Sequence, residues 1–307
     1  MRLSKDYYDG WVLANGVKTH YSWAGTEGPV VILLHGAGPG VSGEAGWRYT
    51  LPGLAKAGFR VFAPDQLSMG FTDKRPHAWP TRGQQSLVDH VADFIDALCL
   101  DEVYIVGNSQ GAYVAAKYAI DHPERVKKMV LIGSALVARA MRDTMPKPDN
   151  NKNLLDVIKY DYSLEAMSKF VTTNTYDASK VTDELIQFRH ETANLPGSKE
   201  ALQASREYQD KMNRNPKLWD RFSLKHSLPN LKIPTKFIWG KQDRMSSVEM
   251  GYELEKKLPN IPFVYLDECG HQCQTDQPEI VNNLLIEFFT EDIESYNQSK
   301  LETERMI

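Results

Sequence analysis

The chain has 307 residues, 42% of them hydrophobic, which is enough for one large core with an inserted subdomain or for two domains. Its 36 Lys and Arg residues against 40 Asp and Glu residues give a net charge of −4, which argues against nucleic acid and anionic membranes as partners. No stretch approaches the length of a membrane span and residues 1–9 lack a signal-type apolar segment, so we expect a cytoplasmic protein that acts on a small molecule.

Short apolar runs alternate with helix-like segments along most of the chain. The runs typical of buried strands cover residues 30–34, 60–65, 103–106, 129–132, 235–240 and 263–266. Apolar side chains also recur at spacings of three and four from Leu87 to Leu98, which predicts an amphipathic helix. Continuous apolar strands separated by helices indicate an α/β fold with a mostly parallel sheet covered on both faces.

This alternation is interrupted between about Arg139 and His226. The segment is rich in charged residues, shows helical patterns at 164–171 and 181–192, and contains no clear strand. Because strands resume at Ile233, we interpret residues 139–226 as a helical lid inserted into a discontinuous core of residues 1–138 and 227–296. The alternative is an ordinary C-terminal half of a larger fold, and residues 297–307 are expected to form a polar tail.

The third apolar run leads directly into Gly107-Asn108-Ser109-Gln110-Gly111, a G-x-S-x-G sequence that opens an alanine-rich helix. A serine hydroxyl is a poor nucleophile at neutral pH and must be exposed on a sharp turn where a histidine can reach it. The motif alone arises by chance in loops, so the flanking strand and helix carry the prediction that Ser109 is a nucleophile.

A serine nucleophile requires a histidine base and a carboxylate that orients it. His271 follows the last predicted strand, which completes the chain order serine, acid, histidine. Asp243 follows the preceding strand, whereas the strand at 129–132 is followed by Gly133-Ser134-Ala135 without a carboxylate. We therefore predict a triad of Ser109, Asp243 and His271.

Three other carboxylates lie in the loop around His271, at Asp267, Glu268 and Asp276. They are too close in sequence for the His271 ring to reach them easily. We expect them to be solvated loop carboxylates.

Acyl-type chemistry also needs donors for an oxyanion. His35-Gly36-Ala37-Gly38-Pro39-Gly40 follows a strong strand and can turn backbone N–H groups inward. The amide of Ala37 and the amide of Gln110, the residue after the nucleophile, would form an oxyanion hole. As a phosphate cradle the loop lacks the required Lys-Ser/Thr ending and the G-x-G-x-x-G spacing.

Neither a metal nor a cofactor is expected. The three cysteines form an odd count without a secreted-domain framework, so free thiols are predicted at Cys99, Cys269 and Cys273. Cys269 and Cys273 flank His271, but the group lacks a fourth ligand and a C-x-x-C pair, which argues against zinc.

Together these residues resemble the α/β-hydrolase family, over a stretch from Trp11 to about Phe289. More narrowly, the sequence from His35 to Ser42 resembles the H-G-x-G-P-G-x-x opening of the meta-cleavage product hydrolases, and Gly107-Asn108-Ser109 matches their G-N-S. Those enzymes hydrolyse a carbon–carbon bond in vinylogous 1,5-diketones formed when aromatic rings are opened. The resemblance implies an α/β-hydrolase fold with a mostly parallel central sheet flanked by helices, an inserted helical lid and no cofactor.

The resemblance also implies substrate contacts. In that group a lid arginine binds the substrate carboxylate or dienolate, and Arg189 falls where it would lie; a solvated helix arginine is the alternative. Asn108 is either a substrate contact or a buried structural amide. The remaining candidate substrate-binding residues are Gly38, Ser42 and Gln272.

Three positions depart from that group. Gly46 stands where the group has an asparagine before Trp47-Arg48, Gln272 stands where a tryptophan often follows the histidine, and Gln110-Gly111-Ala112 replaces M-G-G. The pocket is therefore expected to suit a different substrate, whereas the triad depends on none of these positions.

The leading interpretation is carbon–carbon bond hydrolysis of a ring-fission-type diketone, a small carbonyl-containing molecule derived from an aromatic compound. Hydrolysis of an ester, lactone, amide or carbamate would use the same catalytic residues and stays open. A non-hydrolytic ligand receptor or a cofactor-free oxygenase on the same fold is the second alternative. Assembly into a homodimer or higher homo-oligomer also stays open.

Overall fold

The computed structural model describes residues 3–145 and 159–292. Within these ranges eight strands form one sheet in the order β1-β2-β4-β3-β5-β6-β7-β8. The first two pairings, β1 with β2 and β2 with β4, are antiparallel, and all later ones are parallel. The strands are β1 (Tyr8–Ala14), β2 (Val17–Ala24), β3 (Val30–Leu34), β4 (Arg60–Pro64), β5 (Val103–Asn108), β6 (Val126–Ile132), β7 (Thr235–Gly240) and β8 (Phe263–Leu266). The predicted α/β fold with a mostly parallel sheet is confirmed.

Helices cover both faces of this sheet because its central strands are apolar on both sides. In β3, Ile32 and Leu34 pack into one cluster with α3 (Gln84–Ala97), α4 (Gln110–Asp121) and α11 (Val248–Lys257). Val31 and Leu33 pack into a second cluster with α2 (Thr50–Lys56) and α13 (Pro278–Thr290). Each such buried side chain contributes about 1.5–3 kcal/mol through removal from water. The core helices are α1 (Gly43–Trp47), α2 (Thr50–Lys56), α3 (Gln84–Ala97), α4 (Gln110–Asp121), α5 (Ala135–Ala140), α11 (Val248–Lys257), α12 (Cys273–Asp276) and α13 (Pro278–Thr290).

The hairpin of β1 and β2 was not predicted from the sequence. β1 lies at the edge of the sheet, and its first six residues are exposed or half-buried, among them Trp11 and Leu13. Such a strand has no continuous apolar run, which is the signal that identified the six predicted strands.

After α5, four α-helices follow in the described part of the predicted lid, and no strand lies in its described residues, 139–145 and 159–226. They are α7 (Leu164–Thr173), α8 (Asp183–Ala193), α9 (Ser198–Met212) and α10 (Pro216–Phe222). Side-chain oxygens of Ser163, Thr182 and Asn215 cap the first turns of α7, α8 and α10. Short 3₁₀ turns cover Pro76–Ala78, Pro123–Arg125, Ala178–Lys180 and Leu228–Asn230.

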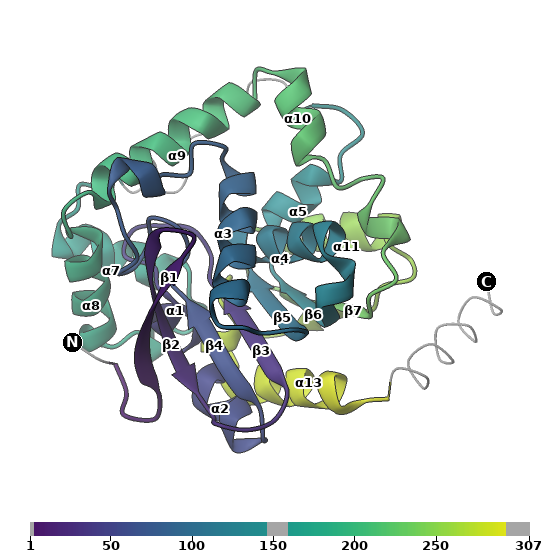
Figure 1. The fold of residues 1–307 in the computed structure, drawn as a ribbon, viewed down its shortest axis with the longest axis horizontal. Coiled ribbons are helices and arrows are strands. Elements are labelled where there is room, and N and C mark those ends of the chain that lie inside the picture. The colour runs from purple at the N-terminus through teal and green to yellow at the C-terminus, as the bar shows by residue number, and fades with distance from the viewer. Residues whose placement is uncertain (1–2, 146–158, 293–307) are drawn as a thin grey trace.

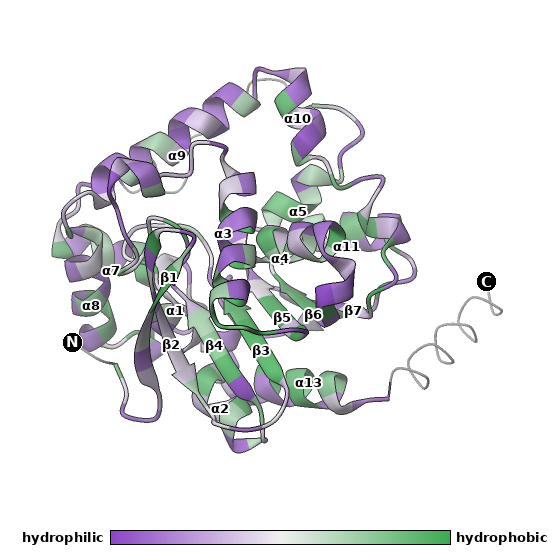
Figure 2. Cartoon of the chain, viewed as in Figure 1, coloured by the Kyte–Doolittle hydropathy of each residue, from purple (hydrophilic) through white to green (hydrophobic). Residues whose placement is uncertain are grey.

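The lid packs on the core through its own apolar cluster. Met167, Phe170 and Phe188 of α7 and α8 are buried together with Ala45 of α1. α9 runs along the outside of the molecule toward α10, as Figure 1 shows, and is mostly hydrophilic in Figure 2. In the described ranges no helix has the length and apolar character needed to cross a membrane. The expected polar tail, residues 297–307, lies outside the described residues.

The close contact between lid and core can be tested at Gly40. It has φ +64°, and a Cβ atom added there would lie 1.9 Å from the backbone oxygen of Arg189 in α8. We expect Gly40→Ala to lower the free energy of unfolding by the backbone strain of about 1–2 kcal/mol plus a further 1–3 kcal/mol of overpacking. Urea titration followed by circular dichroism measures the loss.

Gly16, in the turn between β1 and β2, is the matched control. It has φ +87°, but no atom lies within 4 Å of an added Cβ. Gly16→Ala should therefore show the strain alone, and equal losses in the two variants would contradict the contact described for Gly40.

Candidate active site

Ser109 occupies the sharp turn between β5 and α4. Its backbone has φ +55° and ψ −115°, and α4 begins at the next residue, Gln110. A Cβ added at Gly107 would lie 2.2 Å from the Gly111 oxygen, and one added at Gly111 would lie 2.1 Å from the Leu34 oxygen. The two motif glycines are therefore required for the turn to close against β3, and Ser109 stays half-exposed at its tip.

Asp243 follows β7 and His271 follows β8, and their side chains meet. The Nδ1 atom of His271 lies 2.8 Å from the Asp243 Oδ2 atom, and both side chains are largely buried. The other carboxylate oxygen, Oδ1, accepts the backbone N–H groups of Met245 (2.7 Å) and Ser246 (2.8 Å). With Nδ1–H donated to this fixed carboxylate, the Nε2 atom of His271 is left free to accept a proton.

Asn108 connects the two halves of this arrangement. Its buried Nδ2 group donates to the backbone oxygens of His271 (3.0 Å) and Ile132 (3.3 Å). The residue just before Ser109 thus holds the segment that carries His271. These bonds fit the interpretation of Asn108 as a buried structural amide, and its role in substrate binding stays a prediction.

The prediction that Asp276 is a solvated loop carboxylate is wrong. Its side chain is fully buried and accepts the N–H groups of Gly270 (2.8 Å) and of Tyr176 in the lid (3.0 Å). Burial raises its pKa above the usual value, although the backbone donors partly oppose this. Asp267 and Glu268 are exposed as predicted, and Asp267 pairs with Lys241 at 2.8 Å.

The glycine-rich segment lies beside the nucleophile. Residues 36–42, between His35 and the start of α1, are called the oxyanion loop below. A Cβ added at Gly36 would lie 3.1 Å from the Cβ atom of Ser109. Ala37, the candidate donor, is exposed, and Gln110 lies at the N-terminus of α4, where the helix dipole favours negative charge.

The other candidate substrate-binding residues are Gly38 and Ser42 in this loop and Gln272 after His271. Gly38 and Ser42 both contact other parts of the chain. Gly38 lies against Phe170 of the lid, where an added Cβ would be 2.8 Å from the ring. Ser42 is fully buried, and its hydroxyl accepts the N–H of Ala45 (3.0 Å), which makes it the N-cap of α1. Gln272, the residue after His271, is half-buried before α12.

Arg189 is buried in α8 against the oxyanion loop, so the alternative of a solvated helix arginine is wrong. Its Nη2 group donates to the Pro39 oxygen (2.9 Å), and its guanidinium lies 5.2 Å from the Phe170 ring centroid. Burial lowers the pKa of Arg189 to about 10, and the charge of Arg48 adds to this effect. Its Nε group has no hydrogen-bond partner among the described residues.

Arg48, which directly follows α1, was not among the sequence candidates. It is 8% exposed, donates through Nη1 to the Ala45 oxygen (2.9 Å), and has no partner for Nη2 among the described residues. Charged side chains are rarely buried unless they are paired. Among the described residues, the hydrogen bonds of both guanidinium groups go to backbone oxygens, of Ala45 for Arg48 and of Pro39 for Arg189. The sequence signal that could have identified Arg48 is a charged residue between apolar neighbours, Trp47 and Tyr49.

Gly46 and Gln272, two of the positions that differ from the meta-cleavage product hydrolases, lie near Gln274, which is also a buried polar side chain. Its Nε2 group donates to the Gly46 oxygen (3.3 Å), and its Oε1 atom lacks a partner among the described residues. The Oε1 atom of Gln110 is likewise buried without one. No group of His, Cys, Asp or Glu side chains in residues 3–145 and 159–292 is arranged to hold a metal ion.

Comparison with known proteins gives consistent relatives. The family model for the alpha/beta hydrolase fold matches residues 29–278. A 2-hydroxy-6-oxononadienedioate/2-hydroxy-6-oxononatrienedioate hydrolase of Burkholderia vietnamiensis is 31% identical over 89% of this chain and 91% of its own length. A 2-hydroxy-6-oxo-2,4-heptadienoate hydrolase of Pseudomonas putida is 32% identical over 87% of this chain and 90% of its own length.

Solved structures agree with these relatives. The meta-cleavage product hydrolase of Pseudomonas fluorescens IP01 has a TM-score of 0.76 and 35% identity, covering 91% of this chain and 97% of that one. The 2-hydroxy-6-oxo-6-phenylhexa-2,4-dienoate hydrolase of Rhodococcus sp. strain RHA1 has a TM-score of 0.78 and 25% identity, covering 93% and 99%. The chain therefore belongs to the α/β-hydrolase fold family, and within it is similar to the meta-cleavage product hydrolases.

Proposed function

We propose that this protein is a cofactor-independent serine hydrolase that cleaves a carbon–carbon bond in a ring-fission-type diketone bearing a carboxylate. The observation that carries the proposal is the buried guanidinium of Arg189, which donates to a backbone oxygen of the oxyanion loop and keeps an Nε group without a partner among the described residues. The two relatives are named as hydrolases of 2-hydroxy-6-oxo carboxylates, which supports the same substrate class.

The proposed reaction begins at His271. With Nδ1–H held by Asp243, its Nε2 atom takes the proton of the substrate's enol hydroxyl, and protonation at carbon then gives the keto form. Ser109 or water adds to the second ketone, and the Ala37 and Gln110 amides bind the resulting oxyanion. Collapse of this intermediate breaks the carbon–carbon bond, and one water is consumed overall to give a carboxylic acid and a dienol.

In this proposal, the substrate carboxylate lies at Arg189. A planar guanidinium suits a carboxylate, and a charge-assisted hydrogen bond is stronger where water is excluded. Arg48 supplies a second buried cation close enough to lower the pKa of Arg189, so the pair favours an anionic group. A neutral ester would leave both cations uncompensated.

Ser109→Ala tests the nucleophile. We expect turnover of a ring-fission diketone to fall at least about 10³-fold, because no other side chain replaces the serine. Loss of the dienolate absorbance measures turnover, with 4-nitrophenyl butyrate as the ester substrate. If the wild-type protein hydrolysed the ester but not the diketone, the result would favour the ester, lactone, amide or carbamate alternative. An unchanged rate in Ser109→Ala would contradict the assignment of Ser109 as the nucleophile.

Arg189→Gln tests the anion contact. Loss of a charged hydrogen bond is worth about 1.5–3 kcal/mol, so KM for an acidic diketone should rise roughly 10- to 100-fold. KM for the neutral ester should hardly change. The control is Arg221→Gln on the exposed side of α10, which should alter neither value. Equal losses on both substrates with Arg189→Gln would contradict a carboxylate contact.

Asn108→Asp separates positioning from substrate binding. The substitution keeps the shape but replaces the donor that bonds the His271 and Ile132 oxygens, so the His271 segment should shift. Because a shift of about 1 Å can cost roughly 10²-fold in rate, kcat should fall while KM stays near the wild-type value. Steady-state kinetics on the same diketone measure both constants, and a rise in KM alone would instead indicate a substrate contact.

A further inference from the structure

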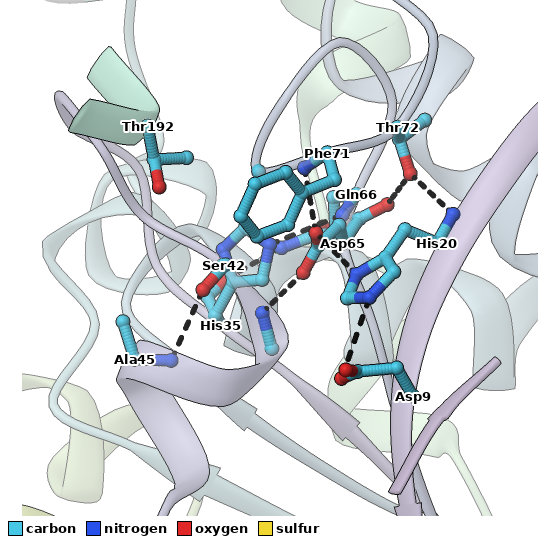
Figure 3. A network of polar contacts seen from close by, with 12 residues as sticks. Asp9, His20, His35, Ser42, Ala45, Asp65, Gln66, Phe71, Thr72 and Thr192 are labelled. Carbon is cyan, nitrogen blue, oxygen red and sulfur yellow. Dashed lines mark hydrogen bonds and ion pairs between the residues drawn. The ribbon is translucent and has the colours of Figure 1, made fainter. Parts of the chain in front are cut away.

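The oxyanion loop is held at both ends by two adjacent residues that follow β4, Asp65 and Gln66. Asp65 is itself paired with His20 of β2 in a buried network (Figure 3). We propose that His20 and Asp65 are positioning residues for the oxyanion hole. This inference rests on the proposed function, because the oxyanion hole matters only if Ser109 chemistry forms an oxyanion.

The two anchors lie on opposite sides of Ala37. At the start of the loop, the backbone N–H of Gln66 donates to the His35 Nε2 atom (3.1 Å), and the Gln66 side chain donates to the His35 oxygen. At the end of the loop, the Oδ1 atom of Asp65 accepts the N–H of Gly43 (2.6 Å). Because Asp65 and Gln66 are consecutive, one rigid strand end fixes both ends of the segment that carries the Ala37 amide.

The second oxygen of Asp65 is fully used as well. Its Oδ2 atom accepts the N–H of Phe71 (2.7 Å) and lies 2.8 Å from the His20 Nδ1 atom. Thr72 closes the network, since its hydroxyl donates to the Asp65 backbone oxygen (2.7 Å) and accepts the N–H of His20 (3.1 Å). Figure 3 shows His20 and Phe71 converging on the carboxylate from different segments.

The charges in this network support each other. Burial alone would raise the pKa of Asp65, but the hydrogen bond and charge of His20 and the Phe71 N–H outweigh burial and lower it. Burial alone would lower the pKa of His20, but the bond and charge of Asp65 outweigh it and raise it. Asp9 of β1, 3.5 Å from His20 Nε2, and Glu44 of α1 act in the same direction. His20 therefore keeps its proton to a higher pH than a free histidine.

Losing one partner should loosen the loop. A buried carboxylate that loses the His20 partner keeps fewer hydrogen bonds, so it would protonate or admit water, and its bond to Gly43 would weaken. Oxyanion donors act mainly in the transition state, so a displaced Ala37 amide lowers kcat with little change in KM. A residue that served stability alone would leave both constants unchanged in folded protein.

The test compares Asp65→Asn and His20→Gln with the control Thr19→Val. Thr19 neighbours His20 on β2, and its buried hydroxyl lies 2.9 Å from the Nε2 atom of His90 in α3, away from the oxyanion loop. The two readouts are kcat and KM for the diketone and the ester, and amide hydrogen exchange of the peptide covering residues 36–43. We expect Asp65→Asn and His20→Gln to lower kcat about 10- to 100-fold and to speed exchange in that peptide.

Thr19→Val should leave kcat and the exchange of residues 36–43 at wild-type values. The double variant with His20→Gln and Asp65→Asn should lose less than the sum of the single losses, because it buries no uncompensated charge. Unchanged exchange in both Asp65→Asn and His20→Gln would overturn the proposal, as would the same exchange and kinetic changes in Thr19→Val. If the wild type turns over neither substrate, the proposed function fails, while the exchange measurement still decides whether the network holds the loop.

Discussion

Parallel pairing of the central strands is the constraint on which the candidate site depends. It places the carboxyl ends of β3, β5, β7 and β8 on the same side of the sheet. The oxyanion loop, Ser109, Asp243 and His271 follow these four strands and therefore lie on that side. The Asn108 side chain then joins two of these ends by a hydrogen bond to the His271 oxygen. The sheet provides rigidity, and the loops provide the chemistry.

Buried charge is used in two different ways in this fold. Lys128 on β6 is buried but satisfied, since its ammonium group donates to the backbone oxygens of Phe288 (2.6 Å) and Glu291. Asp65 is satisfied through both oxygens. Arg48 and Arg189 instead retain nitrogen atoms without partners among the described residues. Such atoms cost stability when left unpaired, which is the physical ground for the anionic substrate group proposed above.

Local patterns in the sequence predicted the features that depend on neighbouring residues. Strands buried on both faces appear as continuous apolar runs, and the turn at Ser109 needs glycines at fixed positions, so both could be identified. The edge strand β1 has exposed and half-buried residues instead of a continuous apolar run, so the same signal could not identify it. Asp276 was misjudged because its partner Tyr176 is 100 residues away.

The bonds of Asp276 link the lid to the segment that carries His271. Its carboxylate joins Gly270, the residue before His271, to Tyr176 in the lid, and Lys180 of the same lid segment donates to its backbone oxygen. Any movement that carries the Tyr176 segment away from the core must break these bonds and leave a buried carboxylate with fewer donors. The energetic cost of moving this part of the lid therefore falls on the loop that holds His271, so this loop is best ordered when the Tyr176 segment is packed on the core.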